Sequence, residues 1–215
     1  MKTIIILVII ASAITFISCK FSNSKTNKTV EKSNDISFLF KTNSFSYIFF
    51  RNDCRNEIKD LLKDLKYTVY KTKNLKCDLY AINSYLNESN SSQNIVNKGL
   101  FFNSNFTVLI DPEMVVSTYE EQLIDFAKKN NTTIISVIWE RYSQAKIMVV
   151  ISPVGLVSKT ISVPGQDIPD NFKPNHNVLN GVDEQSLLEA LTTLDVPYKN
   201  ILSGVLDVEL LKLYE

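Results

Sequence analysis

The stretch of residues 106–162 constrains the fold more than any other part of the chain, because all of its local signals agree. It opens with a continuous, β-branched apolar run at residues 106–110, which predicts a buried strand. Asp111 and Pro112 end that strand, since proline has no N–H to donate to a neighbouring strand. Three more strand-like runs complete the stretch, at residues 133–139, 146–151 and 156–163.

A helix is expected between the first and second of these strands. Ser117 and Glu120 fit a capping box, in which both side chains bond to free N–H groups at the start of a helix. Leu123 and Ala127 then lie on one face of a helix over residues 117–129. A strand, a helix and a meander predict an α+β fold with a largely antiparallel sheet and helices packed on one side.

The flanking segments extend this pattern. Ile58, Leu61, Leu62 and Leu65 recur at helical spacing and predict a helix over residues 53–65. The other expected elements are strands at residues 36–40, 45–51, 67–71 and 77–82 and C-terminal helices at residues 183–194 and 207–214. The polar run at residues 87–97 predicts an exposed loop, and it leaves open a division into halves at residues 36–86 and 99–215.

The N-terminus has the character of an export signal. Lys2 precedes an apolar run that continues to Ile17, which is short for a membrane span and typical of a secretory signal. The run ends at Ser18 and Cys19, and this resembles the lipobox of bacterial lipoproteins. The resemblance implies that Cys19 carries acyl chains such as palmitate and becomes the new N-terminus. An ordinary cleaved signal or an N-terminal anchor helix, with Cys19 incidental, is the alternative.

These signals predict the order of the chain. Residues 1–18 are the signal peptide, residues 19–35 are the lipidated cysteine with a flexible tether, and residues 36–215 are a single α+β domain. The tether is too polar to bury the surface that folding requires. By resemblance to sorted lipoproteins, Lys20 after the lipidated cysteine implies the outer membrane, facing the periplasm. The membrane is thus an expected partner, reached through the lipid on Cys19.

The two remaining cysteines are Cys54 and Cys77. An even pair in an exported protein predicts a disulfide, which would fasten the helix at residues 53–65 to the sheet. Two buried thiols are the alternative. Two thiols without a nearby histidine do not make a zinc site, so no metal is expected.

The inventory for catalysis is small. The one histidine, His176, lies in a segment rich in proline and asparagine, and the five glycines form no phosphate-binding loop. We therefore expect no catalytic residues and no cofactor. Basic and acidic residues number 23 each, so no net charge favours nucleic acid.

Carboxylates are the only remaining candidates for chemistry. Asp111 and Glu113 follow one strand, and Glu140 ends another beside Trp139 and Arg141. Neighbouring strands would bring an acidic pair beside an aromatic ring, as in sugar hydrolysis. In the simpler interpretation Asp111 caps a turn, Glu113 is solvated, Trp139 is core, and Glu140 and Arg141 form an edge ion pair. These five residues are our candidate binding surface.

The segments at residues 107–114 and 138–141, with the helix between them, are similar to small uncharacterised bacterial α+β domains, some thought to be immunity proteins that neutralise toxins. That resemblance implies a binder and not a catalyst. We therefore expect a membrane-anchored envelope lipoprotein that binds a protein, either a toxin or an envelope component. A carboxylate-dependent glycan hydrolase and a purely structural envelope lipoprotein are the alternatives.

Overall fold

The computed structural model describes residues 44–90, 96–162, 192 and 205–214. The expected signal, Cys19, the tether, the strand at residues 36–40, His176 and nearly all of the expected helix at residues 183–194 lie outside the described residues. Among the helices that are described, none is long and apolar enough to cross a membrane.

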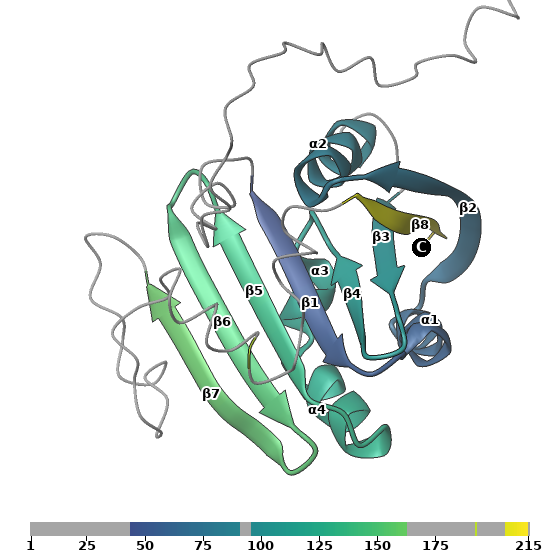
Figure 1. The fold of residues 1–215 in the computed structure, drawn as a ribbon. Coiled ribbons are helices and arrows are strands. Elements are labelled where there is room, and N and C mark those ends of the chain that lie inside the picture. Colours follow the sequence, from purple (N-terminus) through teal and green to yellow (C-terminus); the bar gives the residue numbers. More distant parts are fainter. Residues whose placement is uncertain (1–43, 91–95, 163–191, 193–204, 215) are drawn as a thin grey trace, which may run out of the picture. The chain divides into compact units, whose positions relative to one another are not determined.

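One antiparallel sheet contains all eight described strands, in the order β2-β8-β3-β4-β1-β5-β6-β7 (Figure 1). This confirms the α+β class and the antiparallel sheet. The strands are β1 (Phe45–Arg51), β2 (Thr68–Cys77), β3 (Val96–Phe102), β4 (Phe106–Ile110), β5 (Ile134–Glu140), β6 (Ala145–Ser152), β7 (Gly155–Ser162) and β8 (Leu206–Tyr214). Strands from both of the halves considered above share this sheet, since β1 lies between β4 and β5.

The middle of the sheet is apolar on both faces. Along β1, Phe45 and Phe49 lie in one buried cluster, and Ile48 and Phe50 lie in another. Successive side chains of a strand point to opposite faces, so the two clusters are the two sides of the sheet. Each side therefore needs its own cover from helices or loops.

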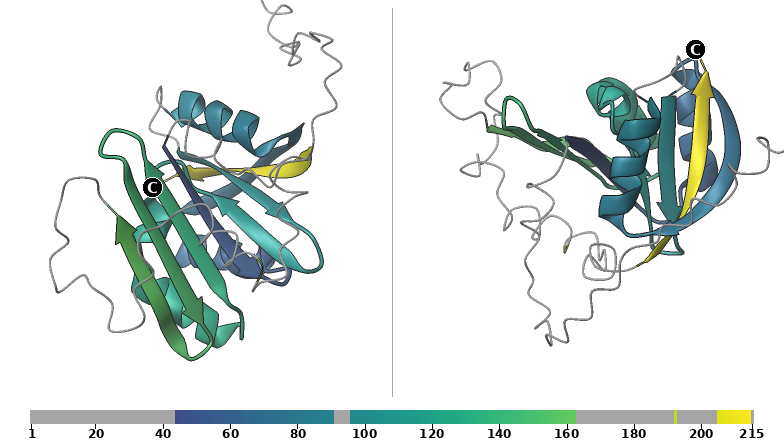
Figure 2. Two further views of the ribbon diagram at one scale, coloured as in Figure 1. Left: turned by 60° about the vertical axis from the view of Figure 1, so that its left-hand side comes forward. Right: turned by 90° about the horizontal axis from the view of Figure 1, so that it is seen from above.

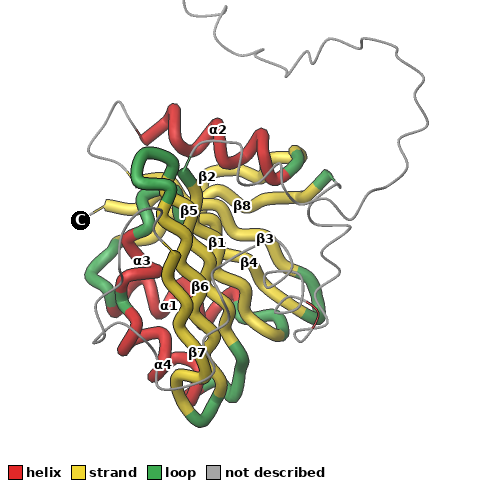
Figure 3. The backbone as a smooth tube through the Cα atoms, turned by 90° about the vertical axis from the view of Figure 1, so that its left-hand side faces the viewer, coloured by secondary structure: helices red, strands yellow, loops and turns green. Residues whose placement is uncertain are grey.

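Helices are present on both faces. Helices α1 (Arg55–Asp64), α3 (Val115–Thr118) and α4 (Glu120–Lys129) pack on the face of Ile48. Helix α2 (Leu79–Asn90) packs on the face of Phe45. Figure 3 shows α1, α3 and α4 together on one side of the strands, with α2 apart from them. The expectation that all helices lie on one side is therefore wrong, because a sheet that is apolar on both faces cannot leave one of them bare.

The expected C-terminal helix at residues 207–214 is also wrong. This segment is β8, which lies between β2 and β3 and is the yellow strand beside the blue β2 in Figure 2. Val208 and Leu210 enter one buried cluster, and Leu211 enters the other. Buried Glu209 forms an ion pair of 2.8 Å with Lys59 of α1. Strand geometry buries more apolar side chains here than one helical stripe would.

Two local predictions about where helices begin are also wrong. Residues 77–82, expected as a strand, contain the end of β2 and the start of α2. The carboxylate of Asp78 accepts a hydrogen bond of 2.7 Å from the N–H of Ala81, which is a helix cap that the strand interpretation missed. The expected capping box is absent as well. Ser117 lies inside α3, its hydroxyl donates to the carbonyl of Met114, and α4 begins after Tyr119 without a side-chain cap.

Candidate functional site

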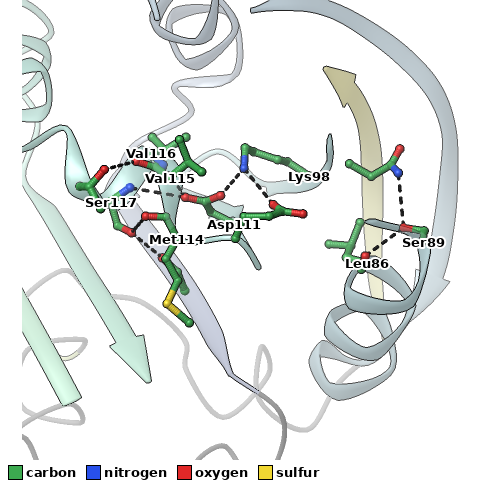
Figure 4. A network of polar contacts seen from close by, with 12 residues as sticks. Leu86, Ser89, Lys98, Asp111, Met114, Val115, Val116 and Ser117 are labelled. Carbon is green, nitrogen blue, oxygen red and sulfur yellow. Dashed lines mark hydrogen bonds and ion pairs between the residues drawn. The ribbon is translucent and has the colours of Figure 1, made fainter. Parts of the chain in front are cut away.

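A buried ionic cluster joins β3 to the segment after β4. The side chains of Lys98 and Asp111 have no exposed surface, and they form an ion pair. The carboxylate of Glu113 lies 3.3 Å from the same ammonium and keeps a quarter of its side chain exposed. Figure 4 shows Lys98 pointing toward the carboxylate of Asp111. Burial raises the pKa of Glu113, and the nearby Lys98 opposes that shift.

Asp111 also holds α3 against the sheet. Its second carboxylate oxygen accepts hydrogen bonds from the N–H groups of Val116, at 2.6 Å, and Ser117, at 3.4 Å. Its own N–H donates to the carbonyl of Ser46 on β1, at 2.9 Å. The hydroxyl of Ser46 donates to that of Ser117 at 3.2 Å. Every polar atom of Asp111 therefore has a structural partner, which agrees with the simpler interpretation of this residue as a cap. The expectation that Glu113 is solvated is wrong, since most of it is buried.

Glu140 closes the hairpin between β5 and β6. Its carboxylate accepts hydrogen bonds from the N–H groups of Tyr142, at 2.9 Å, and Ser143, at 2.6 Å. It also accepts from the hydroxyls of Ser143, at 2.6 Å, and Ser44, at 3.2 Å. The bonds from Ser143 and Tyr142 lower the pKa of Glu140 to about 2. These hydrogen bonds therefore favour the ionised form of Glu140 and give its carboxylate a structural role in the hairpin.

The five residues of the candidate binding surface do not form one site. Trp139 is buried in the cluster of Phe45, and the ammonium of Lys146 lies 5.6 Å from its ring centroid. Asp111 lies on the opposite face, with α3. Strand β1 also lies between β4 and β5, so the residues that follow these two strands are not neighbours. The N–H of Arg141 donates a hydrogen bond to the hydroxyl of Ser44, which itself bonds to Glu140. A carboxylate as buried as Asp111 cannot contact a sugar, so this set gives the hydrolase alternative no support.

The expected disulfide is contradicted, because no bond joins the sulfur of Cys54 to that of Cys77. Cys54 packs into the cluster beneath α1, and Cys77 packs against the cluster on the other face of the sheet. The sheet therefore stands between the two sulfurs. The thiol of Cys54 lies 3.4 Å from the carbonyl of Arg51, and burial raises its pKa.

A groove between α1 and α4 is the site that sequence reasoning missed. It encloses about 400 Å³ on the face that carries both helices. Each helix contributes residues at positions i, i+3, i+4 and i+7, which form a single stripe. The stripes are Glu57, Asp60, Leu61 and Asp64 on α1 and Gln122, Asp125, Phe126 and Lys129 on α4, with Asn130 at the end. This spacing is visible in each helix alone, but the pairing of the two helices is not.

The groove is acidic at its rim and apolar at its base. Four carboxylates and one ammonium line it, so the sum of −4 and +1 is −3. Asp60 pairs with Lys63 on its own helix at 2.9 Å, and this contact lowers its pKa. Glu57, Asp64 and Asp125 are exposed and form no salt bridge with another described residue. Leu61 and Phe126 are buried, with 6% of each exposed.

No protein-family model, curated protein or solved structure matches this chain. Within the described ranges, no three His, Cys, Asp or Glu side chains gather closely enough to hold a metal ion. The functional argument therefore depends on the geometry of this chain and on its N-terminal sequence.

Proposed function

We propose that this chain is an exported bacterial lipoprotein that is held at a membrane through Cys19 and acts by binding another protein. The anchoring half of the proposal is supported by the sequence. An apolar run ends at Ser18 and Cys19, and a polar tether of residues 20–34 follows. Several acyl chains on one cysteine hold a protein at a membrane durably, at about 0.8 kcal/mol for each buried CH₂ group.

The groove between α1 and α4 is the observation that carries the binding half. Its walls are fixed, because Ile58 and Leu62 of α1 and Leu123 and Ala127 of α4 are buried against the sheet. A groove whose walls are already in place costs little conformational entropy to fill. An apolar base within a polar rim is also the usual anatomy of a protein-binding surface.

Two kinds of partner fit this proposal. The resemblance to immunity domains favours a toxin, and the expected location favours an envelope component. Deletion of the gene separates them. If the partner is a toxin, cells that lack this protein become sensitive to that toxin, and unchanged sensitivity leaves an envelope component as the partner.

The anchor is tested by the mass of the mature protein purified from its own membranes. We expect an N-terminus at Cys19 that carries acyl groups, and a Cys19→Ala variant that no longer fractionates with membranes. A water-soluble product that retains Met1 would contradict the anchor.

Binding is tested by chemical crosslinking in intact cells. We expect one protein to recur in the crosslinked species of the full-length chain. If repeated experiments with reagents of different length recover none, the purely structural alternative stands instead.

A further inference from the structure

We infer that the groove between α1 and α4 receives a positively charged peptide segment of the partner, with one apolar side chain seated over Leu61 and Phe126. This inference deepens the proposed function and depends on it, because it names the chemistry of the partner. Its first support is charge. Glu57 and Asp64 on one wall and Asp125 on the other wall have no salt bridge among the described residues.

The charge is not cancelled by its surroundings. Lys129 is the only cation in the lining, and it also lies near enough to Asp60 to lower the pKa of that carboxyl. When Lys63, the partner of Asp60, is counted with the lining, the sum changes from −3 to −2. A groove of this sign attracts Lys and Arg side chains and repels acidic ones.

The apolar base of the groove can bind an apolar side chain of the partner. Leu61 on α1 and Phe126 on α4 line the groove, and both belong to the buried cluster beneath the helices. A volume of about 400 Å³ holds a few side chains, and not a folded domain. An amphipathic segment laid along two helices meets both demands, because it places its apolar residues inward and its charged residues along the rim.

The same charges argue against a lipid surface as the occupant. Bacterial membrane surfaces are anionic, and they attract polybasic segments. Three exposed carboxylates, Glu57, Asp64 and Asp125, would instead face like charge. The groove is therefore suited to a cationic peptide, and contact with the membrane is made by the lipid on Cys19.

A binding titration with a synthetic probe tests the inference. The probe is a 14-residue amphipathic helical peptide of leucine and lysine only, and its counterpart has glutamate in place of every lysine. The protein is the full lipidated chain in neutral detergent micelles, and affinity is followed by fluorescence anisotropy of the labelled peptide. The groove variant is Glu57→Gln with Asp125→Asn, and the control variant is Glu121→Gln with Asp207→Asn. Both pairs are exposed and remove the same charge, but only the first pair lines the groove.

We expect the lysine peptide to bind and the glutamate peptide not to bind. The groove variant should bind the lysine peptide about fivefold more weakly, since each exposed ion pair is worth up to about 1 kcal/mol. The control variant should bind it as the wild type does. Equal weakening in both variants, which would indicate general attraction to an acidic protein, or no binding at all overturns the inference.

One other occupant is tested in the same assay. The expected tether at residues 20–34 has four lysines against one glutamate and is itself positive. If neutralising Lys20, Lys25, Lys28 and Lys32 strengthens peptide binding, the groove receives the chain's own tether, and the inference about a partner is wrong. The crosslinking experiment described under the proposed function distinguishes failure of this inference from failure of the proposed function. A recurring partner that the groove variant captures unchanged overturns this inference and leaves the proposed function in place.

Discussion

Replacing Asp111 by asparagine tests the ionic cluster at the end of β4. The asparagine side chain can still accept a hydrogen bond from the N–H of Val116, and Asn caps a helix about as well as Asp. What it loses is the negative charge that faces Lys98, whose side chain is fully buried. The substitution therefore isolates the ion pair from the cap.

The expected cost follows from the geometry of the pair. Removing one partner of a buried ion pair costs about 3–5 kcal/mol, because the remaining charge stays buried. Glu113 remains 3.3 Å from the ammonium of Lys98, so some compensation persists. We therefore expect the free energy of unfolding to fall by about 3 kcal/mol, which is a large part of the usual 5–15 kcal/mol.

Urea unfolding measures this cost. The chain has a single tryptophan, and Trp139 is buried, so its fluorescence reports the transition. Asp53→Asn is the matched control, because Asp53 pairs with Arg55 at the surface and its loss should cost less than about 1 kcal/mol. The double variant of Asp111→Asn with Lys98→Met should recover most of the loss, since neither charge then remains unpaired. A cost below about 1 kcal/mol for Asp111→Asn, or a double variant no better than the single one, would refute the reasoning.

Four further predictions concern other parts of the fold. Burial raises the pKa of Glu113 above its ordinary 4.5, so the stability that its protonated form contributes is full below pH 4.5 and is lost as the pH rises through the raised pKa. In urea unfolding, the free energy of unfolding of Glu113→Gln should not show this decline with pH. The shift of Glu140 has the opposite sign, with a pKa lowered to about 2, so Glu140→Gln should lower the melting temperature at pH 7, and this effect should shrink as the pH falls from 4.5 through 2. In the native protein a thiol reagent should modify half-buried Cys77 before buried Cys54, and equal rates would contradict their placement. Leu210→Ala in β8 should lower the free energy of unfolding in urea by about 2–5 kcal/mol, because Leu210 is buried, whereas Val205→Ala, at an exposed position, should cost little. Equal small costs for the two substitutions would contradict the burial of Leu210 in β8.

The sequence predicted those elements whose signals are local. The apolar run at β4 and the strand-like runs at residues 146–151 and 156–163, which are β6 and β7, are recognisable without any distant contact, and all three strands are present. The apolar spacing of Ile58, Leu61 and Leu62 likewise predicted α1 within two residues of its bounds. These elements succeed because their side-chain periods of two or about 3.6 fit only one geometry.

Predictions failed where a distant partner decides the conformation. In β8, Val208 and Leu211 fit a helical stripe as well as a strand, and only insertion between β2 and β3 makes the strand the better choice. The disulfide failed because spacing along the chain does not reveal that Cys54 and Cys77 face opposite sides of the sheet.

The groove could not be predicted for the same reason. The acidic stripe of α1 and the mixed stripe of α4 are each visible in the sequence, but the two helices are about 60 residues apart in the chain. Only the sheet order, with β1 next to both β4 and β5, brings them to one face. Predicting this groove therefore requires the order of strands in the sheet, and the residue spacing within each helix is not enough.

Site-specific photocrosslinking in intact cells tests most directly whether this chain binds a protein through the groove. A photo-reactive amino acid replaces Gln122, which lines the groove, or Lys128, which is exposed on α4 outside it. The account predicts that illumination links the full-length protein to one partner from position 122 and not from position 128. Capture of that partner from position 128 but not from position 122 would contradict it.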